Sequence, residues 1–288
     1  MRTALVFGAS GQIGEALLAR LSKAGWQVLA VSRTPRTSSS NVRWLQGEFA
    51  GIDGLPASVD VIFSTGPLDG FAHWYARGQV ATSRVVAFGS TSLETKQDSG
   101  DAYERDIVAR LQSAERTVFD TASATGAAAT LLRPTLVYGA GRDQTLARIA
   151  AMARRLGCFV LPRGADGKRQ PVHVDDLAAA ALAVVDASAT HRQAYALPGG
   201  ETLAYRDMVA RTLAALSPPA RLWELPMPLF RMLLGIARRV GAMRGLTDDA
   251  VARIREDLVF DATPAVRDFG YAPRAFVVDA RALGENGR

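Results

Sequence analysis

The 288-residue chain has one cysteine and three histidines, and this scarcity excludes several kinds of site. Cys158 cannot form an intrachain disulfide bond, because it has no second cysteine to pair with. His73, His173 and His191 lie too far apart to show a metal-ligand spacing, so we expect no bound metal. No uncharged apolar run approaches the ~18 residues that a membrane-spanning helix needs, so no transmembrane segment is expected.

The chain also has no long tract of serine, glutamine or proline. Its composition, 48% hydrophobic and 22% charged, is typical of a folded globular protein. Residues 1–3 lead directly into a strand-like run without space for a signal peptide, and we expect a cytoplasmic location. The net charge of +6 suits an anionic partner, but the arginines are dispersed without aromatic interleaving, so nucleic acid is not expected.

Short β-like runs alternate with helical patterns in the first half of the chain. The expected helices include residues 13–24 and 108–122, and the expected strands are residues 3–7, 27–31, 42–45, 59–63, 84–88 and 129–132. These strands are continuous apolar runs, which is typical of a parallel sheet covered on both faces. The sequence therefore predicts an α/β fold with a doubly wound parallel sheet of the Rossmann type.

A smaller, discontinuous substrate lobe is expected to interrupt the sheet domain. After Tyr138 the pattern changes to expected helices over 146–156 and 202–216, separated by a strand and helix over 172–185. We therefore assign two parts to each domain. The dinucleotide-binding domain comprises residues 1–140 and 168–197, and the substrate lobe comprises residues 141–167 and 198–288.

Three glycines separate the first expected strand from the first expected helix in the stretch VFGASGQIGEALL, residues 6–18. At such a junction, glycines permit a tight turn, the approach of the backbone to a pyrophosphate, and close packing of the helix on the strand. The G-x-x-G-x-x-G spacing is longer by one residue than the dinucleotide fingerprint G-x-G-x-x-G. The stretch predicts a cofactor-binding loop made by Gly8, Ser10, Gly11, Gln12, Ile13 and Gly14.

Arg33 follows the second expected strand, where an NAD enzyme would carry an acidic residue for the ribose 2′-hydroxyl. A guanidinium pairs with a 2′-phosphate, whereas a carboxylate repels it. The sequence therefore favours NADP(H), with NAD(H) as the alternative cofactor. An ordinary solvated arginine is the alternative interpretation of Arg33, because the chain is rich in arginine.

Five further stretches carry a family resemblance. They are VVAFGSTS (85–92), LLRPTLVYGAGRD (131–143), RQPVHVDDLA (169–178), AYALPGGETLAYRDM (194–208) and FDATPAVRDFGYAPR (260–274). Together with the glycine spacing, they resemble the extended branch of the short-chain dehydrogenase/reductase superfamily, of the nucleotide-sugar epimerase/dehydratase type. The resemblance covers nearly the whole chain. It implies a nicotinamide cofactor and a nucleotide-linked sugar as the small-molecule substrate, and it leaves a homodimer open.

The resemblance also implies roles for individual residues. Thr91 takes the place of the hydroxyl that hydrogen-bonds the reacting substrate oxygen, and Pro134 lies beside the nicotinamide. Arg169 matches the arginine that grips the substrate diphosphate, and Tyr138 is placed in the substrate site. Two simpler interpretations stay open, namely a turn cap for Thr91 and a surface charge for Arg169.

The Y-x-x-x-K pair of this family is missing. In the family, the tyrosine transfers a proton while the lysine lowers its pKa, which requires both side chains on one helical face. Ile107 and Leu111 stand in these two places, and neither can move a proton. Tyr103, one helical turn upstream, is the candidate for a displaced catalytic group. We expect an NAD(P)-dependent enzyme, and the alternative is a catalytically silent NADP(H)-binding regulatory or structural protein.

An apolar stripe at helical spacing occupies residues 226–243, with arginines around it. The stripe is formed by Leu229, Met232, Leu233, Ile236 and Val240, and the arginines are Arg231, Arg238 and Arg239. We favour packing into the core of the second lobe, and the alternative is a helix that lies on an anionic membrane.

Overall fold

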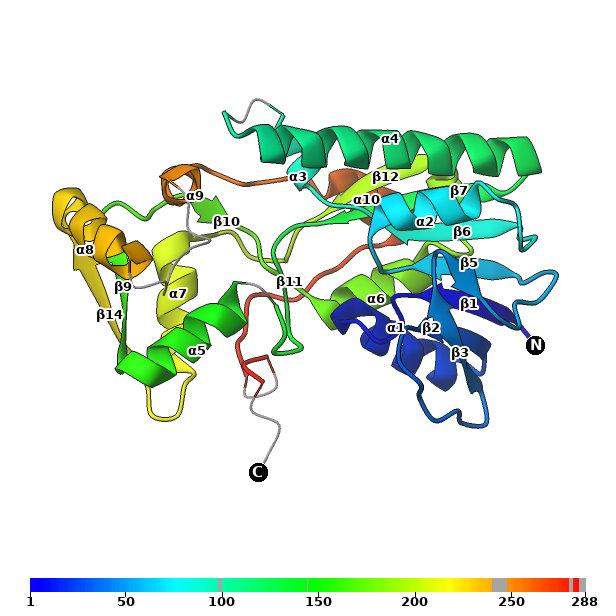
Figure 1. The fold of residues 1–288 in the computed structure, drawn as a ribbon, viewed down its shortest axis with the longest axis horizontal. Helices are drawn as coiled ribbons and strands as arrows, with labels where there is room; N and C mark the ends of the chain where they lie inside the picture. Colours follow the sequence, from blue (N-terminus) through cyan, green and yellow to red (C-terminus); the bar gives the residue numbers. More distant parts are fainter. Residues whose placement is uncertain (98–99, 144, 240–247, 280–281, 285–288) are drawn as a thin grey trace. The chain divides into compact units, whose positions relative to one another are not determined.

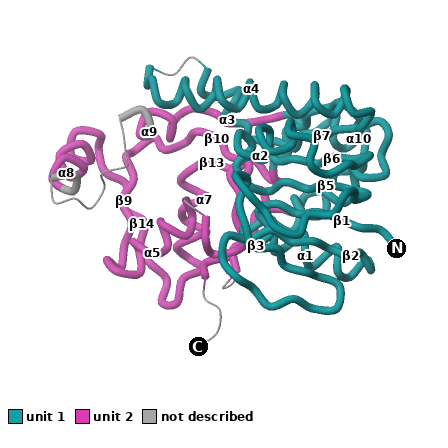
Figure 2. The backbone as a smooth tube through the Cα atoms, turned by 45° about the vertical axis from the view of Figure 1, so that its right-hand side comes forward, with its two compact units in different colours: residues 1–135, 174–198, 261–273 teal, residues 136–173, 199–260, 274–288 magenta. Residues whose placement is uncertain are grey.

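The computed structural model describes residues 1–97, 100–143, 145–239, 248–279 and 282–284. The chain divides into two compact units (Figure 2). Unit 1 comprises residues 1–135, 174–198 and 261–273, and unit 2 comprises residues 136–173, 199–260 and 274–288. Val240 of the apolar stripe lies outside the described residues.

Unit 1 is built on an eight-stranded sheet with the strand order β12-β7-β6-β5-β1-β2-β3-β4. The strands are β1 (Thr3–Phe7), β2 (Gln27–Ser32), β3 (Val42–Glu48), β4 (Gly51–Ile52), β5 (Val61–Ser64), β6 (Arg84–Phe88), β7 (Ala128–Pro134) and β12 (Gln193–Leu197). All neighbours pair in parallel except β3 and β4. The strand order reverses beside β1, which confirms the predicted doubly wound α/β fold.

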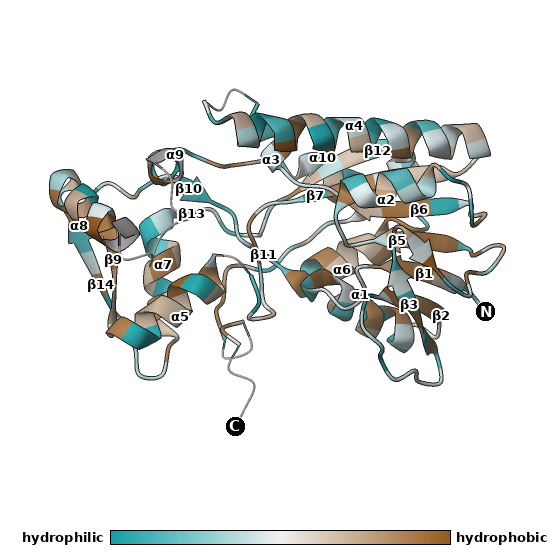
Figure 3. Cartoon of the chain, viewed as in Figure 1, coloured by the Kyte–Doolittle hydropathy of each residue, from teal (hydrophilic) through white to brown (hydrophobic). Residues whose placement is uncertain are grey.

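Helices cover both faces of this sheet. The helices α1 (Gln12–Lys23) and α6 (Val174–Ala183) pack together on one face, and α2 (Leu68–Tyr75) and α4 (Ala102–Thr125) pack together on the other (Figure 1). A short helix, α3 (Ser92–Thr95), precedes α4. The central strands β1, β5 and β6 are largely hydrophobic along their length, because helices cover them on both faces (Figure 3).

An aromatic cluster fills the core beneath the end of β1. The ring of Phe7 lies 4.3 Å from that of Trp74 and 5.7 Å from that of Phe71, measured between centroids. Trp74 and Phe71 belong to α2, and all three side chains are at most 2% exposed. The cluster therefore anchors α2 to the strand from which the glycine stretch emerges.

A buried arginine connects several elements near strands β6 and β7 of the sheet. Arg84, at the start of β6, is 4% exposed, and its guanidinium donates to the Val184 and Val185 carbonyls and to the hydroxyls of Thr130 and Thr190. Burial lowers the pKa of Arg84 to about 10. One side chain thus joins β6 and β7 to the segment that follows α6.

In the part of unit 2 that the structure describes, helices are combined with three short strand pairs. The helices are α5 (Leu146–Leu156), α7 (Tyr205–Ala214), α8 (Met227–Arg239) and α9 (Asp248–Arg253). The strand pairs are β8 (Val137–Tyr138) with β11 (Val172–His173), β9 (Cys158–Pro162) with β14 (Arg221–Leu225), and β10 (Lys168–Arg169) with β13 (Leu203–Ala204). Its core includes Leu146, Ile149, Met208, Leu213 and Phe276. Among the described residues, no helix has the length and apolarity to cross a membrane.

The units differ from the expected domains at several boundaries. Residues 136–140 and 168–173 belong to unit 2, whereas residue 198 and residues 261–273 belong to unit 1. The segment 261–273 contains α10 (Thr263–Phe269). The Tyr195 hydroxyl donates to the Asp268 carboxylate at 2.7 Å, and the Tyr271 hydroxyl donates to the Pro198 carbonyl at 2.8 Å. These two bonds attach the segment to β12 and the residue that follows it.

Candidate functional site

The backbone turns sharply between β1 and α1. Gly8 has a φ of +68°, and a Cβ atom there would lie 2.6 Å from the Gly66 nitrogen. A Cβ atom on Gly14 would lie 2.2 Å from the Gly8 carbonyl oxygen. Neither position accepts a side chain unless the backbone moves. The absence of these side chains lets the first turn of α1 lie directly against the end of β1.

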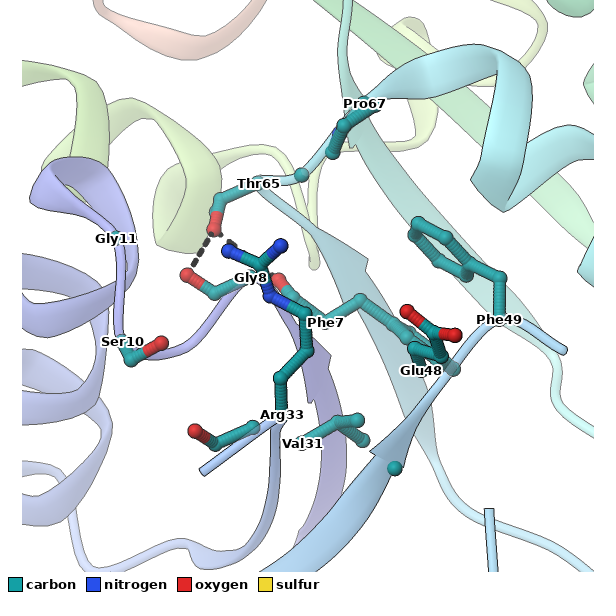
Figure 4. Close-up of a pocket in the computed structure, with 13 residues that line it drawn as sticks. Phe7, Gly8, Ser10, Gly11, Val31, Arg33, Glu48, Phe49, Thr65 and Pro67 are labelled. Carbon is teal, nitrogen blue, oxygen red and sulfur yellow. Dashed lines mark hydrogen bonds between the residues drawn. The ribbon is translucent and has the colours of Figure 1, made fainter. Parts of the chain in front are cut away.

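This turn forms one wall of a cavity of about 450 Å³. The other walls are the residues that follow β2, β3 and β5, and the strands from which they emerge are parallel. The lining residues are Phe7, Gly8, Ser10, Gly11, Val31, Ser32, Arg33, Gly47, Glu48, Phe49, Thr65, Gly66 and Pro67 (Figure 4). The cavity lies at the carboxyl ends of the strands where their order reverses, which is the usual ligand position in a doubly wound sheet.

Hydrogen bonds hold the turn in place from the side of β5. The Thr65 hydroxyl donates to the Phe7 and Gly8 carbonyls, at 3.1 and 3.0 Å, and the Thr65 N–H donates to the Phe7 carbonyl at 3.0 Å. The Gly11 N–H donates to the Gly8 carbonyl at 2.8 Å. Hydrogen bonds within the protein therefore hold the turn in this conformation.

The N-terminus of α1 faces this turn. Gly11 is the N-cap, and no side chain caps the helix there. The free amides of a first helical turn carry partial positive charge and bind anions. The side-chain oxygen of Gln12 is buried and has no hydrogen-bond partner among the described residues. Ile13 is 9% exposed and packs beneath the turn.

Arg33 reaches the same cavity from the residue that follows β2. Figure 4 shows Ser10 and Gly11 on one side, Glu48 and Phe49 on the other, and Arg33 between them in this view. The structure thus brings together the glycine turn and the arginine that the sequence analysis proposed for the cofactor.

Glu48 and Phe49 are cavity residues that the sequence analysis missed. Phe49 stacks on Phe7 with ring centroids 5.3 Å apart and an interplanar angle of 21°. The sequence could have predicted their position, because Glu48 ends the third strand and the carboxyl ends of parallel strands meet at one edge of a sheet.

Thr91 and Pro134 lie together at the ends of two neighbouring strands. The Thr91 hydroxyl donates to the Pro134 carbonyl at 3.1 Å, and the Thr91 N–H donates to the same oxygen at 3.3 Å. Thr91 is 7% exposed and is the N-cap residue of α3, although its side chain makes no cap hydrogen bond. In this conformation its hydroxyl proton is therefore directed to the backbone.

The helix α4 has no tyrosine–lysine pair facing the sheet. Leu111 packs against the core of unit 1, and Ile107 is partly buried. Tyr103 is 68% exposed on the first turn of α4. In the structure, Tyr103 therefore does not occupy the place of the missing tyrosine–lysine pair.

A largely buried ion pair lies one helical turn beyond Leu111 on α4. The Arg133 guanidinium donates to both carboxylate oxygens of Glu115, at 2.8 Å from its Nε atom, and to Glu94 at 3.1 Å. Hydrogen bonding to the Glu115 carboxylate raises the pKa of Arg133. The pair connects the end of β7 to α3 and α4.

Arg169 holds the backbone of unit 2 together. It is 6% exposed, so the interpretation as a surface charge is wrong. Its guanidinium donates to the carbonyls of Lys168 and Glu256 at 2.7 Å and of Arg253 at 2.5 Å, and lies over the Tyr205 ring. Burial lowers the pKa of Arg169. This geometry favours a structural role over the expected contact with a substrate diphosphate.

Tyr138 is fully buried in the core of unit 2. Its hydroxyl accepts a hydrogen bond from the Val277 N–H at 3.3 Å, and its ring meets those of His173 and Phe276 edge-on, with centroids 5.1 and 5.0 Å away. The expected substrate contact at Tyr138 stays a prediction, and the structure shows a packing role.

Comparisons with known proteins agree with this geometry. A model of the NAD dependent epimerase/dehydratase family matches residues 4–85 and 109–197. The chain belongs to this family. The matched residues include the glycine turn, Arg33, β7 and β12, so the family identity covers most of the sheet.

Curated relatives of this epimerase/dehydratase chain have differing activities. It is 26% identical to the 2-alkyl-3-oxoalkanoate reductase of Stenotrophomonas maltophilia (strain K279a) over 316 residues, covering 95% of each chain. It is also 26% identical to the UDP-glucose 4-epimerase of Vibrio cholerae over 170 residues, covering 57% of this chain and 51% of that protein. MoeE5 in complex with UDP-glucose and NAD has a TM-score of 0.69 at 17% identity, covering 98% of this chain and 96% of that chain. This structural likeness shows the shared fold.

The first prediction concerns Gly11, which lines the cavity. A Cβ atom there would lie 3.0 Å from the Gly8 carbonyl, and the remaining atoms of a branched side chain would fill space at the α1 N-terminus. We expect Gly11→Val to abolish binding of NADPH and NADH while the chain stays folded. Isothermal titration calorimetry measures binding, and circular dichroism checks the fold.

Gly100→Val is the matched control, because a Cβ atom there meets nothing within 4 Å. This control should bind the dinucleotide as the unmodified chain does. Normal affinity in a folded Gly11→Val protein would show that the glycines serve only the turn.

The second prediction concerns Arg169. Arg169→Ala leaves the carbonyls of Lys168, Arg253 and Glu256 without their buried donor, so we expect stability to fall by about 2–4 kcal/mol. Denaturant unfolding followed by circular dichroism measures the loss. Arg206→Ala is the control, since that side chain is 48% exposed. Equal stability of both variants would contradict the structural role.

Proposed function

We propose that the cavity at the β1–α1 turn binds a nicotinamide dinucleotide and that the chain is an NADP(H)-dependent oxidoreductase or epimerase/dehydratase. The observation that carries this proposal is the shape of the β1–α1 turn, which we call the cofactor cradle. Side chains at Gly8 and Gly14 would collide with backbone, and Gly11 places an uncapped helix N-terminus at the cavity. Backbone amides at such a terminus bind a pyrophosphate.

The residues present fit this cofactor. The amides of the first turn of α1 would hold the pyrophosphate, and the stacked Phe7 and Phe49 rings offer an apolar surface in the same cavity. The buried Gln12 oxygen provides an acceptor without a partner among the described residues. When bound, the nicotinamide supplies hydride transfer. Solved structures of this fold, such as MoeE5 and WbmH, were determined in complex with NAD, which supports the cofactor class.

Arg33 supports the finer proposal of NADP(H). Its guanidinium shares the cavity with Ser10 and Gly11 and would pair with a 2′-phosphate. Glu48 lines the same cavity, and a carboxylate accepts hydrogen bonds from ribose hydroxyls. NAD(H) is therefore the alternative cofactor. The relative strength of the Arg33 and Glu48 contacts would set the preference between NADP(H) and NAD(H).

For the chemical step, the chain offers two candidate groups. Thr91 is proposed to donate a hydrogen bond from its hydroxyl to the reacting substrate oxygen, which requires release of its bond to the Pro134 carbonyl. Tyr103 is the second proposed group, a proton donor that lies exposed on the first turn of α4 and not in the place of the missing tyrosine. Ile107 and Leu111 cannot assist either group. General acid–base assistance accelerates reactions by about 10²–10⁴-fold, so we propose slow turnover.

A nucleotide-linked sugar is the first proposed substrate class. Structures of the same fold contain UDP-glucose or UDP-glucuronic acid, and a relative over half the chain is a UDP-glucose 4-epimerase. The second class is a 3-oxoalkanoate, because the reductase relative covers 95% of both chains. The backbone bonds of Arg169 favour this second class, since they leave the expected diphosphate contact unsupported.

A catalytically silent binder is the second candidate function. The apolar pair on α4 favours it, because an intact cofactor cradle without a proton donor would bind dinucleotide and transfer no hydride. Such a protein would serve a partner as a regulatory or structural element.

The third prediction tests the cofactor preference. We expect the unmodified chain to bind NADPH more tightly than NADH, and Arg33→Asp to reduce that preference about tenfold or more. A charge-assisted hydrogen bond contributes about 1.5–3 kcal/mol. Titration of both cofactors provides the ratio. Arg43→Asp is the control, an exposed arginine on β3 outside the cavity lining. An unchanged ratio in Arg33→Asp would reject the assignment.

The fourth prediction tests catalysis. We expect slow turnover with a member of a panel of UDP-sugars, dTDP-sugars and 3-oxoalkanoates, followed by nicotinamide absorbance in single-turnover reactions. Thr91→Ala should lower the rate about a hundredfold, as removal of one oxyanion donor does. Thr91→Ser should retain most of the activity, and Tyr103→Phe should cause a smaller loss.

The silent-binder candidate makes the opposite prediction for this panel. A ligand that raises the melting temperature in the presence of NADP, yet leaves the cofactor and itself unchanged over hours, supports the silent binder. Equal rates for Thr91→Ala and Thr91→Ser would exclude the Thr91 hydroxyl from the reaction.

A further inference from the structure

Exposed large hydrophobic side chains gather on α5, β14 and α8 of unit 2. Each of the following is between 40% and 67% exposed: Leu156, Trp223, Leu229, Met232, Leu233 and Ile236. Single exposed apolar residues are ordinary on protein surfaces, whereas a cluster indicates an interaction site. The stripe that the sequence analysis placed in the core of the second lobe is therefore largely at the surface.

The apolar surface of α8 has a buried part and an adjoining exposed part. Phe230 and Leu234 are buried and pack with Val251, which attaches the helix to unit 2. Leu229, Met232, Leu233 and Ile236 follow the spacing i, i+3, i+4, i+7 and form the adjoining exposed face. Figure 3 shows hydrophobic residues on this helix together with hydrophilic ones. If α8 served only to complete the core, the buried residues Phe230 and Leu234 would be enough, and the exposed apolar residues would have no role.

A cavity of about 220 Å³ extends the exposed face inward. It lies between α5, β9 and α8, and its lining includes Met152, Cys158 and Val160. Leu156 and Leu233 line the cavity and are also exposed, so the hollow opens at the edge of the apolar face. An apolar hollow of this kind accepts hydrocarbon.

The same elements carry a strong positive charge. Their described side chains include the five arginines Arg148, Arg154, Arg155, Arg221 and Arg231, and one acidic residue, Glu224. Arg155 precedes the exposed Leu156, and Arg221 lies on the same side of β14 as the exposed Trp223. Cationic side chains therefore flank the exposed apolar residues.

We propose that α8, with the end of α5 and β14, docks on an anionic phospholipid bilayer. A bilayer surface satisfies both features, because its acyl region takes the aliphatic face and its headgroups pair with the arginines. Such a helix lies in the interface without spanning it. The cavity beside Leu156 and Leu233 takes part of an acyl chain.

Two other occupants fit less well. A second copy in a two-fold dimer would place this arginine-rich surface against itself, and like charges repel. A nucleic acid would use the arginines, but it would gain nothing from Leu229, Met232 and Ile236, and the surface offers a single exposed aromatic side chain, Trp223, among the described residues.

The fifth prediction tests the docking surface by co-sedimentation of the full chain with vesicles. We expect binding to vesicles of phosphatidylcholine mixed with phosphatidylglycerol, weaker binding to phosphatidylcholine alone, and release by salt. Met232→Glu with Ile236→Glu should weaken binding about tenfold or more, because it places charge on the inserted face. Arg155→Glu with Arg221→Glu should cause a similar loss.

Matched control variants introduce the same changes of charge at sites outside the proposed docking surface. Val266→Glu with Val277→Glu alters two exposed valines, and Arg43→Glu with Arg116→Glu reverses two exposed arginines. All four double variants should keep the circular dichroism spectrum and NADPH affinity of the unmodified chain. Loss of vesicle binding confined to the α8 and arginine variants supports the proposal. No vesicle binding, equal losses in the controls, or a dimer that these variants convert to monomer would overturn it.

Discussion

The close approach of α1 to the end of β1 is the constraint on which the rest of the site depends. Gly14 lies against the Gly8 carbonyl, where a Cβ atom would be 2.2 Å away, and Thr65 holds the same turn from β5. This contact directs the start of α1 toward the carboxyl edge of the sheet. Because β2 and β3 run parallel to β1, Arg33 and Glu48 arrive at that edge as well.

Local signals allowed much of the fold to be predicted from the sequence. Apolar runs marked the strands, and the expected strand at 84–88 matches β6 (Arg84–Phe88). The glycine turn and Arg33 lie at strand ends, as expected, and line one cavity. Arg169 was interpreted from the motif around it, and its bonds to residues 253–256 come from a segment more than eighty residues away. Residues 261–273 similarly join unit 1 through long-range bonds that no local pattern contains.

The apolar residues on α4 change what the remaining polar groups can do. Leu111 contributes to the core of unit 1, so the helix is held by packing at the place where the family carries a reactive pair. The buried carboxylates on this helix are paired, Glu104 with Lys96 and Glu115 with Arg133 of β7. This stretch of α4 therefore contributes packing, and Ile107 and Leu111 offer no titratable group where the family resemblance places one.

The buried Arg84 has a consequence for the order in which the chain becomes structured. Its hydrogen-bond partners include Thr130 on β7 and the residues at 184–190, and β12 completes the edge of the sheet at 193–197. Between β7 and these partners lies the first long segment of unit 2. On the ribosome, the N-terminal unit therefore stays open along one edge, with Arg84 lacking its partners at 184–190, until about two-thirds of the chain has emerged.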